Sequence, residues 1–266
     1  MGQVLFDAGR INDIPYLKKM WKDIFKDDDS YIDLFFSYKF KEGNTFVIRD
    51  NGKIISTLYV EYTDIFIDEK IYKGAYFCGI ATLSEYRKKG YAKKLIEYAK
   101  ENIKNVDIIY LIPANESLFD FYKESGFRVF TCLDKEKVIA DKKKRLESFS
   151  SEFNYLKVKN FYENSKNNLY IKRDEKFFNA IYDCYKNVMI FDDGYVFYYI
   201  DNDVLHLIEY SFSYNRAKEI LKGILNLKNL KEGILYKKWG QTPFSVCITD
   251  VDIESIENKY INLMLN

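Results

Sequence analysis

The sequence predicts an α/β protein of the α+β type, with a mixed sheet, helices that cover it, and two successive units. Three observations support this prediction. Apolar residues alternate at strand spacing in some segments and recur at helical spacing in others. Asn-Gly and Asp-rich turns separate the strand-like segments, as hairpin turns do. The chain has 266 residues, of which 47% are hydrophobic, enough for one large or two small cores.

The composition restricts the class of function. The net charge of +1 argues against nucleic acid or an anionic membrane as the main partner. No segment approaches the ~20 apolar residues of a spanning helix, and the first residues lack the apolar core of a signal peptide, so we expect a cytoplasmic protein. One histidine and four separated cysteines argue against a metal site and for reduced thiols at Cys78, Cys132, Cys184 and Cys247.

The first 40 residues predict a short strand and two helices. A strand at 4–6 precedes a helix over 14–26, for which Asn12 and Asp13 are candidate caps. Three aspartates at 27–29 end this helix. A metal site is one interpretation of them, but a loop that caps the next helix fits better because no further ligand has useful spacing. The second helix, 30–40, is rich in aromatic residues, which we expect in the core or around a substrate pocket.

An antiparallel meander is expected next. The turn Asp50-Asn51-Gly52 is a strong hairpin predictor, because both Asn and Gly tolerate positive φ. A second turn is predicted at Asp68-Glu69. The strands around these turns are expected at 45–49, 53–62, 65–67 and 71–81.

A turn with the pattern R-x-x-G-x-A then joins the last strand to an amphipathic helix over 92–104. Its pattern residues are Arg87, Gly90 and Ala92. Unpaired N–H groups in a glycine-bearing turn at a helix N-terminus bind anions, and the helix dipole adds positive potential. This turn therefore predicts a phosphate-binding loop.

A second pattern, N-x6-Y-x3-G-F, follows a predicted strand at 107–112 and spans a predicted helix at 116–125. It consists of Asn115, Tyr122, Gly126 and Phe127. In this order the two patterns resemble the acyl-CoA-binding half of the GNAT superfamily of N-acetyltransferases. The resemblance is close over 76–127 and extends back to residue 3. Ser84 stands where family members often have proline, which loosens the turn but removes no phosphate donor.

The resemblance implies that acetyl-CoA is the co-substrate and that its diphosphate binds the glycine-bearing loop. The pantetheine arm would run beside the preceding strand, where one main-chain N–H would stabilise the oxyanion. Asn115 would bond the arm, although a helix N-cap is its alternative role. The implied binding residues are Ile80, Ala81, Thr82, Arg87, Lys88, Lys89, Gly90, Tyr91, Ala92 and Asn115.

The resemblance also implies a general acid. Tyr122 occupies that position, and a phenol with a pKa near ~10 can protonate a departing thiolate with a pKa near ~8.5. The alternative is one more packed aromatic residue. Glu61 is our candidate base for the acceptor amine, with Asp64 and Glu85 as further candidates, although each could be an ordinary solvated charge.

The remaining chain predicts a closing hairpin at 128–140 around Asp134-Lys135, a connecting helix at 141–154, and a second unit at 155–266. The first unit is thus a GNAT acetyltransferase domain at 1–140. Helix, hairpin, helix and strands recur in the second unit, so we hypothesise a degenerate GNAT-like copy that covers the acceptor side or forms a homodimer. Neither pattern recurs, which argues against a second cofactor site. Its elements are expected at 175–188, 195–200, 204–210, 215–227, 234–237, 244–249 and 253–265.

Two functions remain open from the sequence. The leading one is transfer of an acetyl group from acetyl-CoA to a primary amine of a small molecule or peptide, by direct attack. The alternative is a non-catalytic acyl-CoA-binding sensor or interaction module. The loop pattern supports both, whereas Tyr122 and a carboxylate base support only the enzyme. Nucleic-acid binding through the basic segments is disfavoured by the neutral charge.

Overall fold

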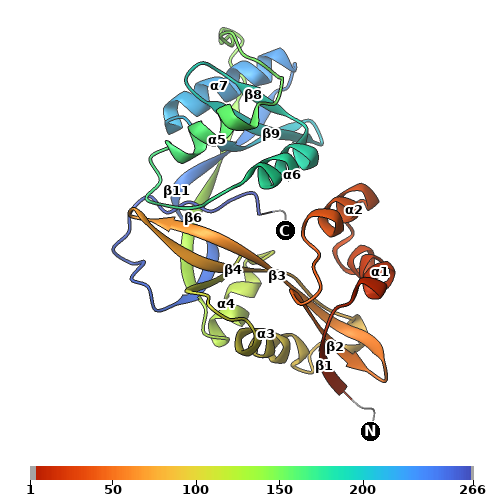
Figure 1. Ribbon diagram of the computed structural model, residues 1–266. Helices are drawn as coiled ribbons and strands as arrows, with labels where there is room; N and C mark the ends of the chain where they lie inside the picture. The colour runs from red at the N-terminus through yellow and green to blue at the C-terminus, as the bar shows by residue number, and fades with distance from the viewer. Residues whose placement is uncertain (1–3, 265–266) are drawn as a thin grey trace.

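The computed structural model describes residues 4–264, in which one twisted sheet runs through both halves of the molecule (Figure 1). The strand order is β1-β2-β3-β4-β5-β11-β10-β9-β8, with β6 paired to β11 and β7 paired to β3. The strands are β1 (Val4–Ala8), β2 (Thr45–Asp50), β3 (Lys53–Ile67), β4 (Lys70–Thr82), β5 (Ile108–Leu111), β6 (Arg128–Ile139), β7 (Leu169–Ile171), β8 (Val188–Ile190), β9 (Tyr195–Asp201), β10 (Val204–Tyr210) and β11 (Glu232–Thr249). The predicted mixed α/β class is confirmed.

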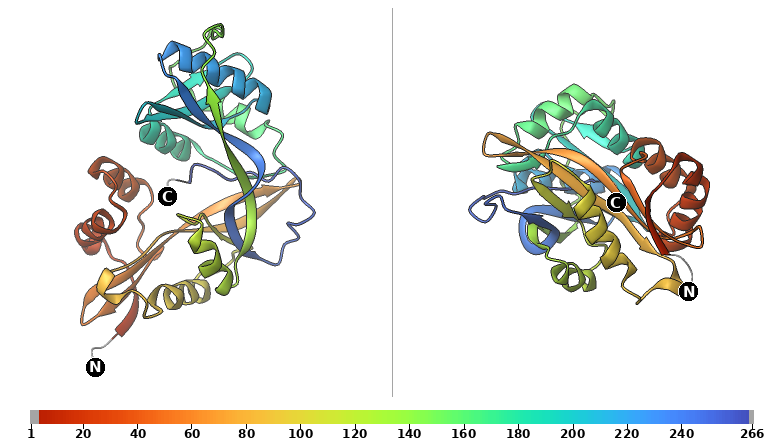
Figure 2. Two further views of the ribbon diagram at one scale, coloured as in Figure 1. Left: turned by 180° about the vertical axis from the view of Figure 1, so that it is seen from behind. Right: turned by 60° about the horizontal axis from the view of Figure 1, so that its bottom comes forward.

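Helices cover both faces of the N-terminal sheet (Figures 1 and 2). Helices α1 and α2 lie on one face, where Trp21 and Phe35 are buried against Tyr59 of β3. Helices α3 and α4 lie on the other face, and α3 buries Leu95 and Ile96 in a second apolar cluster. The helices are α1 (Ile14–Phe25), α2 (Asp29–Tyr38), α3 (Tyr91–Asn102), α4 (Ser117–Glu124), α5 (Tyr155–Glu163), α6 (Glu175–Tyr185) and α7 (Tyr214–Leu227).

The two strands beside the phosphate-loop pattern pair over only a short stretch, because β5 ends at Leu111. Strands β4 and β5 are parallel and are joined through α3, and their register runs only from Gly74↔Ile108 to Tyr76↔Tyr110. Beyond Tyr76, β4 continues to Thr82 without a partner on that edge. The edge of β4 after Tyr76 is therefore unpaired on the β5 side, where the family resemblance implies a slot for the pantetheine arm.

The predicted hairpin at 128–140 is wrong. β6 is a single strand, and Asp134 and Lys135 pair with Lys237 and Tyr236 of β11 instead of forming a turn. β11 is equally long, because its first part pairs with β10 and its last part, from Val246, pairs with β5. The strand that closes the C-terminal half thus also completes the N-terminal sheet.

The C-terminal half repeats the element order of the N-terminal half. Two helices, α5 and α6, precede the antiparallel strands β8, β9 and β10, and α7 then leads to β11. β10 and β11 are parallel across α7, as β4 and β5 are across α3. This order supports the hypothesis of a degenerate second copy.

Two predicted helices are absent, each for a physical reason. The segment 141–153 is irregular because Leu146 packs against Gly223 of α7 and Asn226 bonds the carbonyls of Asp141 and Lys144. The segment 253–264 has no helix because it lies extended beside β7, where Tyr260 N donates to Leu169 O. Residue 265 of that prediction lies outside the described residues.

Candidate functional site

The loop between β4 and α3 is open and rich in free donors. Gly90 is the N-cap of α3 at φ 78°, and a Cβ built there would meet no atom within 4 Å. Among the described residues, the N–H groups of 88–93 have no hydrogen-bond acceptor, while Lys94 N donates to Gly90 O. Residues 87–90 are exposed. The predicted phosphate cradle is therefore free to accept an anion.

Arg87 supports the loop from behind. Its Nε donates to the carbonyl oxygen of Thr82 at 3.0 Å, which ties the loop to the end of β4. Lys88 takes a left-handed φ of 61°, and the Nζ of Lys89 lies 5.1 Å from the ring centroid of Tyr86. The bond from Arg87 thus holds the backbone of the loop in place, while the charges of Lys88 and Lys89 stay near its free N–H groups.

A bulge shapes the end of β4. Tyr59 pairs with Cys78 and Thr57 pairs with Ala81, so Gly79 and Ile80 together face one residue of β3. Gly79 has φ 55°, and a Cβ there would lie 2.6 Å from the Tyr59 ring and 2.7 Å from Trp21. Only glycine fits this close approach.

Hydroxyl groups of β3 hold the bulge. Thr57 Oγ1 donates to Gly79 O at 3.1 Å, and Ser56 Oγ donates to Ala81 O at 2.8 Å. These two residues were missed from the sequence, where small polar residues in a buried strand give the only indication. Their bonds leave the other edge of residues 79–82 for a ligand.

Tyr122 and Asn115 lie at opposite ends of the α4 segment. Tyr122 is 7% exposed in the apolar cluster that also includes Ile80 and Leu83, and burial raises its pKa to about 12. Asn115 is exposed, and its Oδ1 accepts a bond from Ser117 Oγ at 2.7 Å rather than from a helix N–H. Its amide nitrogen has no partner among the described residues, so it is available to bond a ligand.

Glu61 lies farther from the loop. It is in the middle of β3 rather than at the end of a strand, and its register partner is Tyr76, four residues before Ile80. Lys39 Nζ bonds both of its carboxylate oxygens, at 2.5 and 2.6 Å. Asp64 pairs with Lys73, and Glu85 pairs with Lys53. The structure therefore does not gather these carboxylates at the bulge.

Two buried hydroxyls lie on the α2 face of β4. Tyr31 is one of the aromatic residues of the second helix that the sequence places in the core or around a substrate pocket, whereas Tyr76 was missed. Neither hydroxyl has a hydrogen-bond partner among the described residues. Both side chains belong to the cluster that contains Cys78. A buried hydroxyl without a partner is costly, so these two groups are candidate contacts for a bound molecule.

The corresponding region of the second unit is filled. β10 and β11 stop pairing after Leu207↔Leu235, as β4 and β5 do after Tyr76↔Tyr110. Asn262 of the C-terminal segment donates to Ile208 O there, and Arg173 and Glu209 form a buried ion pair beside it. Helix α7 begins with a Ser213 side-chain cap instead of a glycine turn.

Other classes of site are not apparent in residues 4–264. No group of three or more His, Cys, Asp and Glu side chains in this range is placed to hold a metal ion. No helix in the same range combines the length and apolarity needed to cross a membrane.

The sequence matches one family model. Residues 7–130 match the family described as Acetyltransferase (GNAT) domain. No curated protein sequence is significantly similar to the chain.

Solved structures with the same fold cover nearly the whole chain. A GCN5-related N-acetyltransferase from Anabaena variabilis aligns with a TM-score of 0.72 at 14% identity, over 92% of this chain and 72% of its own. A conserved protein of unknown function from Enterococcus faecalis aligns with a TM-score of 0.71 at 12% identity, over the same shares. Eis1 from Mycobacterium abscessus aligns with a TM-score of 0.62 at 11% identity, over 97% of this chain and 69% of its own. These likenesses concern the fold.

Proposed function

Residues 7–130 belong to the GNAT superfamily of acetyltransferases. On this basis we propose that the protein transfers an acetyl group from acetyl-CoA to a primary amine of a small molecule or peptide. The observation that carries this proposal is the open loop at Gly90, where the N–H groups of 88–93 have no acceptor among the described residues. A row of free donors at a helix N-terminus is suited to a diphosphate.

The end of β4 would align the co-substrate. The unpaired edge of Ile80, Ala81 and Thr82 faces the opening between β4 and β5, where a pantetheine arm could pair with the main chain. Because Gly79 turns the backbone at the bulge, an N–H beside it can point at the thioester oxygen and stabilise the negative charge that develops there. The Asn115 amide would bond the arm from the other side.

Tyr122 would supply the proton to the leaving thiolate. The amine attacks the thioester carbon, the C–N bond forms and the C–S bond breaks, so CoA departs as a thiolate. Burial raises the pKa of Tyr122 to about 12, so the phenol stays protonated throughout the neutral range. Burial in the same apolar region would also raise the pKa of the CoA thiol, so the two acids would differ less in strength than if burial affected the phenol alone.

The amine must lose a proton as well. Glu61 remains our proposed base, and its position opposite Tyr76 requires water between the carboxylate and the amine. Lys39 Nζ bonds both of its carboxylate oxygens and holds the side chain in place. The buried hydroxyls of Tyr31 and Tyr76 are the proposed contacts of the acceptor on the α2 face.

A thiol-release assay with acetyl-CoA and a panel of amines tests this function. Release that depends on both acetyl-CoA and an amine, with an acetylated product found by mass spectrometry, is the expected result. Binding of CoA without release on any amine would instead support a non-catalytic acyl-CoA-binding module.

A further inference from the structure

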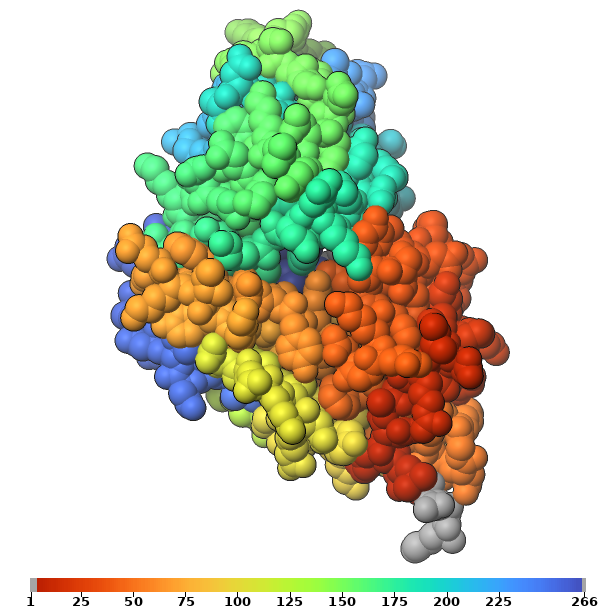
Figure 3. Space-filling model, in the orientation of Figure 1, coloured from red at the N-terminus to blue at the C-terminus, as the bar shows by residue number. Residues whose placement is uncertain are grey.

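A second cleft lies between the two halves, toward the opposite end of β4 from the Gly90 loop. Its walls include residues from 38–41, 60–64 and 172–177, and its volume is about 600 Å³. Figure 3 shows the surface hollowed where the teal segments of the C-terminal half meet the orange segments of the N-terminal half. We call it the interdomain cleft. Its volume is in the range of small-molecule sites.

The interdomain cleft opens at a gap in the sheet. β2 pairs with β3 as far as Thr45↔Tyr59, and β7 pairs with it only from Ile65↔Ile171. On this edge, Val60 N bonds Asn44 O and Lys172 N bonds Asp64 O. Between these two bonds, strand periodicity points the N–H and C=O of Tyr62 into the gap. Both backbone groups of Tyr62 therefore face the cleft. The gap between β2 and β7 is too short for another strand to pair there.

The interdomain cleft has an excess of positive charge. Seven cationic and four acidic side chains border it, and because one of the cations, Arg173, is buried and paired with Glu209 outside the lining, the remaining excess is two charges, where the whole chain has a net charge of only +1. Three of the cations, Lys39, Lys73 and Lys159, are paired with carboxylates of the same cleft. Lys41, Lys172 and Lys176 have no carboxylate within 4.0 Å among residues 4–264. Low-dielectric walls focus such a field.

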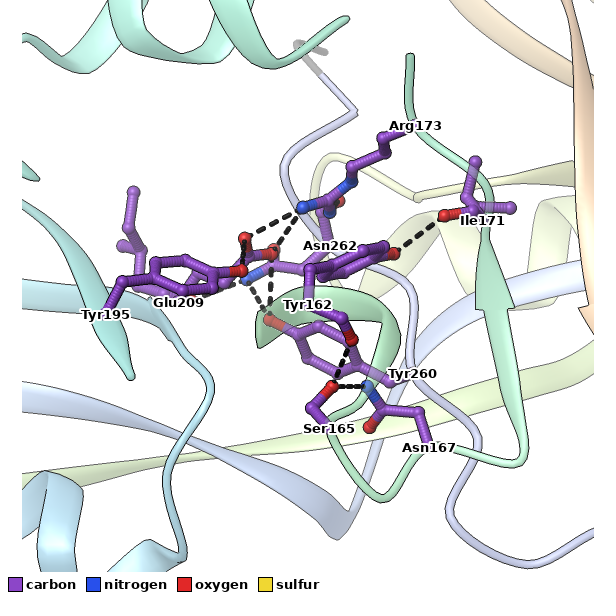
Figure 4. A network of polar contacts seen from close by, with 10 residues as sticks. Tyr162, Ser165, Asn167, Ile171, Arg173, Tyr195, Glu209, Tyr260 and Asn262 are labelled. Carbon is purple, nitrogen blue, oxygen red and sulfur yellow. Dashed lines mark hydrogen bonds and ion pairs between the residues drawn. The ribbon is translucent and has the colours of Figure 1, made fainter. Parts of the chain in front are cut away.

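A buried network fixes the wall that carries two of these lysines (Figure 4). Arg173 Nη1 bonds both oxygens of Glu209 at 2.8 and 2.9 Å, and its Nη2 donates to Asn262 O. Asp174 caps α6 by accepting a bond from Phe177 N. Lys172 and Lys176 therefore project as exposed side chains from a fixed part of the backbone into the lining of the cleft.

We propose that the interdomain cleft is a binding site for a small molecule with two or more anionic groups, carboxylate or phosphate. Lys41, Lys172 and Lys176 would neutralise these groups, and the Tyr62 N–H would donate one main-chain bond. The site uses no residue of the Gly90 loop, and its wall includes Glu61, the proposed base of the transferase. Anion binding by the three lysines can be measured without any turnover.

Calorimetric titration with citrate and, separately, with pyrophosphate tests the proposal. The decisive variant is Lys172→Ala/Lys176→Ala, which removes two exposed side chains and should leave the fold intact by circular dichroism. Lys142→Ala/Lys143→Ala removes the same charge from an exposed segment without a salt bridge. Lys88→Ala/Lys89→Ala removes it from the Gly90 loop.

We expect at least one probe to bind the unsubstituted protein and to lose at least tenfold in affinity in Lys172→Ala/Lys176→Ala. The control variant Lys142→Ala/Lys143→Ala should keep that binding within about threefold, whereas Lys88→Ala/Lys89→Ala reports any pyrophosphate that binds at the Gly90 loop instead. The probe that binds, citrate or pyrophosphate, shows whether the site prefers carboxylate or phosphate groups. The proposal is overturned if neither probe binds, if Lys142→Ala/Lys143→Ala loses as much affinity, or if only the Lys88→Ala/Lys89→Ala variant loses it.

Discussion

At the scale of single residues, Tyr122 illustrates how sequence register and structure contribute differently. Its spacing from Asn115 and Gly126 identifies the position, but spacing gives no information about the acidity of the phenol. The structure adds that the side chain is buried beside Phe121 and Phe127, and that burial raises its pKa to about 12. The phenol is therefore protonated at neutral pH.

We predict that Tyr122→Phe lowers kcat at least about tenfold while the affinity for CoA is unchanged, because only the proton donor is removed. Steady-state kinetics and CoA titration measure the two effects. Tyr98→Phe is a matched control, since this tyrosine of α3 packs against the same apolar cluster. An equal loss of turnover in both variants, or none in Tyr122→Phe, would remove the catalytic role.

The pH dependence follows from the sign of the same pKa shift. A phenol with a pKa raised to about 12 remains protonated from neutral pH up to about pH 11. Any fall of kcat/KM between pH 8 and 10, roughly, must therefore come from another group and should persist in the residual activity of Tyr122→Phe. A basic limb that vanishes in this variant would contradict the assignment.

Two glycines of the site should respond differently to the same substitution. Gly79→Ala adds a methyl group against Tyr59 and Trp21 and forces a positive φ, so we expect a loss of about 3 kcal/mol in unfolding free energy. Gly90→Ala meets open space and should lose only about 1 kcal/mol for its φ. Urea denaturation gives both values, and equal losses would show that the bulge is not closely packed.

At the scale of elements, periodic segments of the N-terminal half were predicted well and long-range pairing was not. The sequence indicates α1, α3 and the strands around Asn51-Gly52 because their patterns and turns are local. It gives no indication that Asp134 faces Lys237, since that register depends on a strand about a hundred residues away. The sequence-predicted turn at 134–135 failed for this reason.

Asp134 has a structural role instead of a turn role. Its Oδ1 accepts bonds from Gln241 N, Thr242 N and Thr242 Oγ1, where β11 leaves the ladder between Lys238 and Pro243. These bonds, with the Thr242 N–H first, lower the pKa of the carboxyl group. The ionised carboxylate therefore stabilises the fold at pH values above the ordinary pKa of an aspartate. This contribution is lost as the pH falls through the lowered pKa of Asp134.

We therefore predict that Asp134→Ala lowers the melting temperature at neutral pH and that the difference from the unsubstituted protein narrows below about pH 4. Thermal denaturation at several pH values measures this difference. Glu124→Ala, at an exposed carboxylate of α4, is the control. A difference in melting temperature that widens in acid would mean that the Asp134 carboxylate does not stabilise the part of β11 between Lys238 and Pro243.

At the scale of the whole molecule, the second copy was suggested by the order of its elements, but its attachment was not foreseen. β11 pairs with strands of both halves of the sheet, and the C-terminal segment lies beside Arg173 and Glu209 where β10 and β11 stop pairing. The pattern of apolar residues in one segment cannot show that a strand pairs with strands of both halves. Acceptor preference is equally absent from the sequence, because it depends on the shape of a pocket that a sequence pattern does not give.

The buried pair should matter for stability across this junction. Arg173→Met leaves Glu209 buried without its partner, and we expect a loss of about 3–5 kcal/mol in unfolding free energy by urea denaturation. Lys137→Met breaks the more exposed pair with Glu232 and should cost less than about 1 kcal/mol. Similar losses for both variants would contradict a dominant role for the Arg173–Glu209 pair.

A crystal structure of the protein soaked with CoA tests the proposed transferase mechanism most directly. We expect density for the diphosphate within hydrogen-bond distance of main-chain N–H groups in the 88–93 loop, with the thiol directed toward the Tyr122 hydroxyl. CoA bound elsewhere, or a thiol that ends on the far side of β4 from Tyr122, would contradict the transferase mechanism.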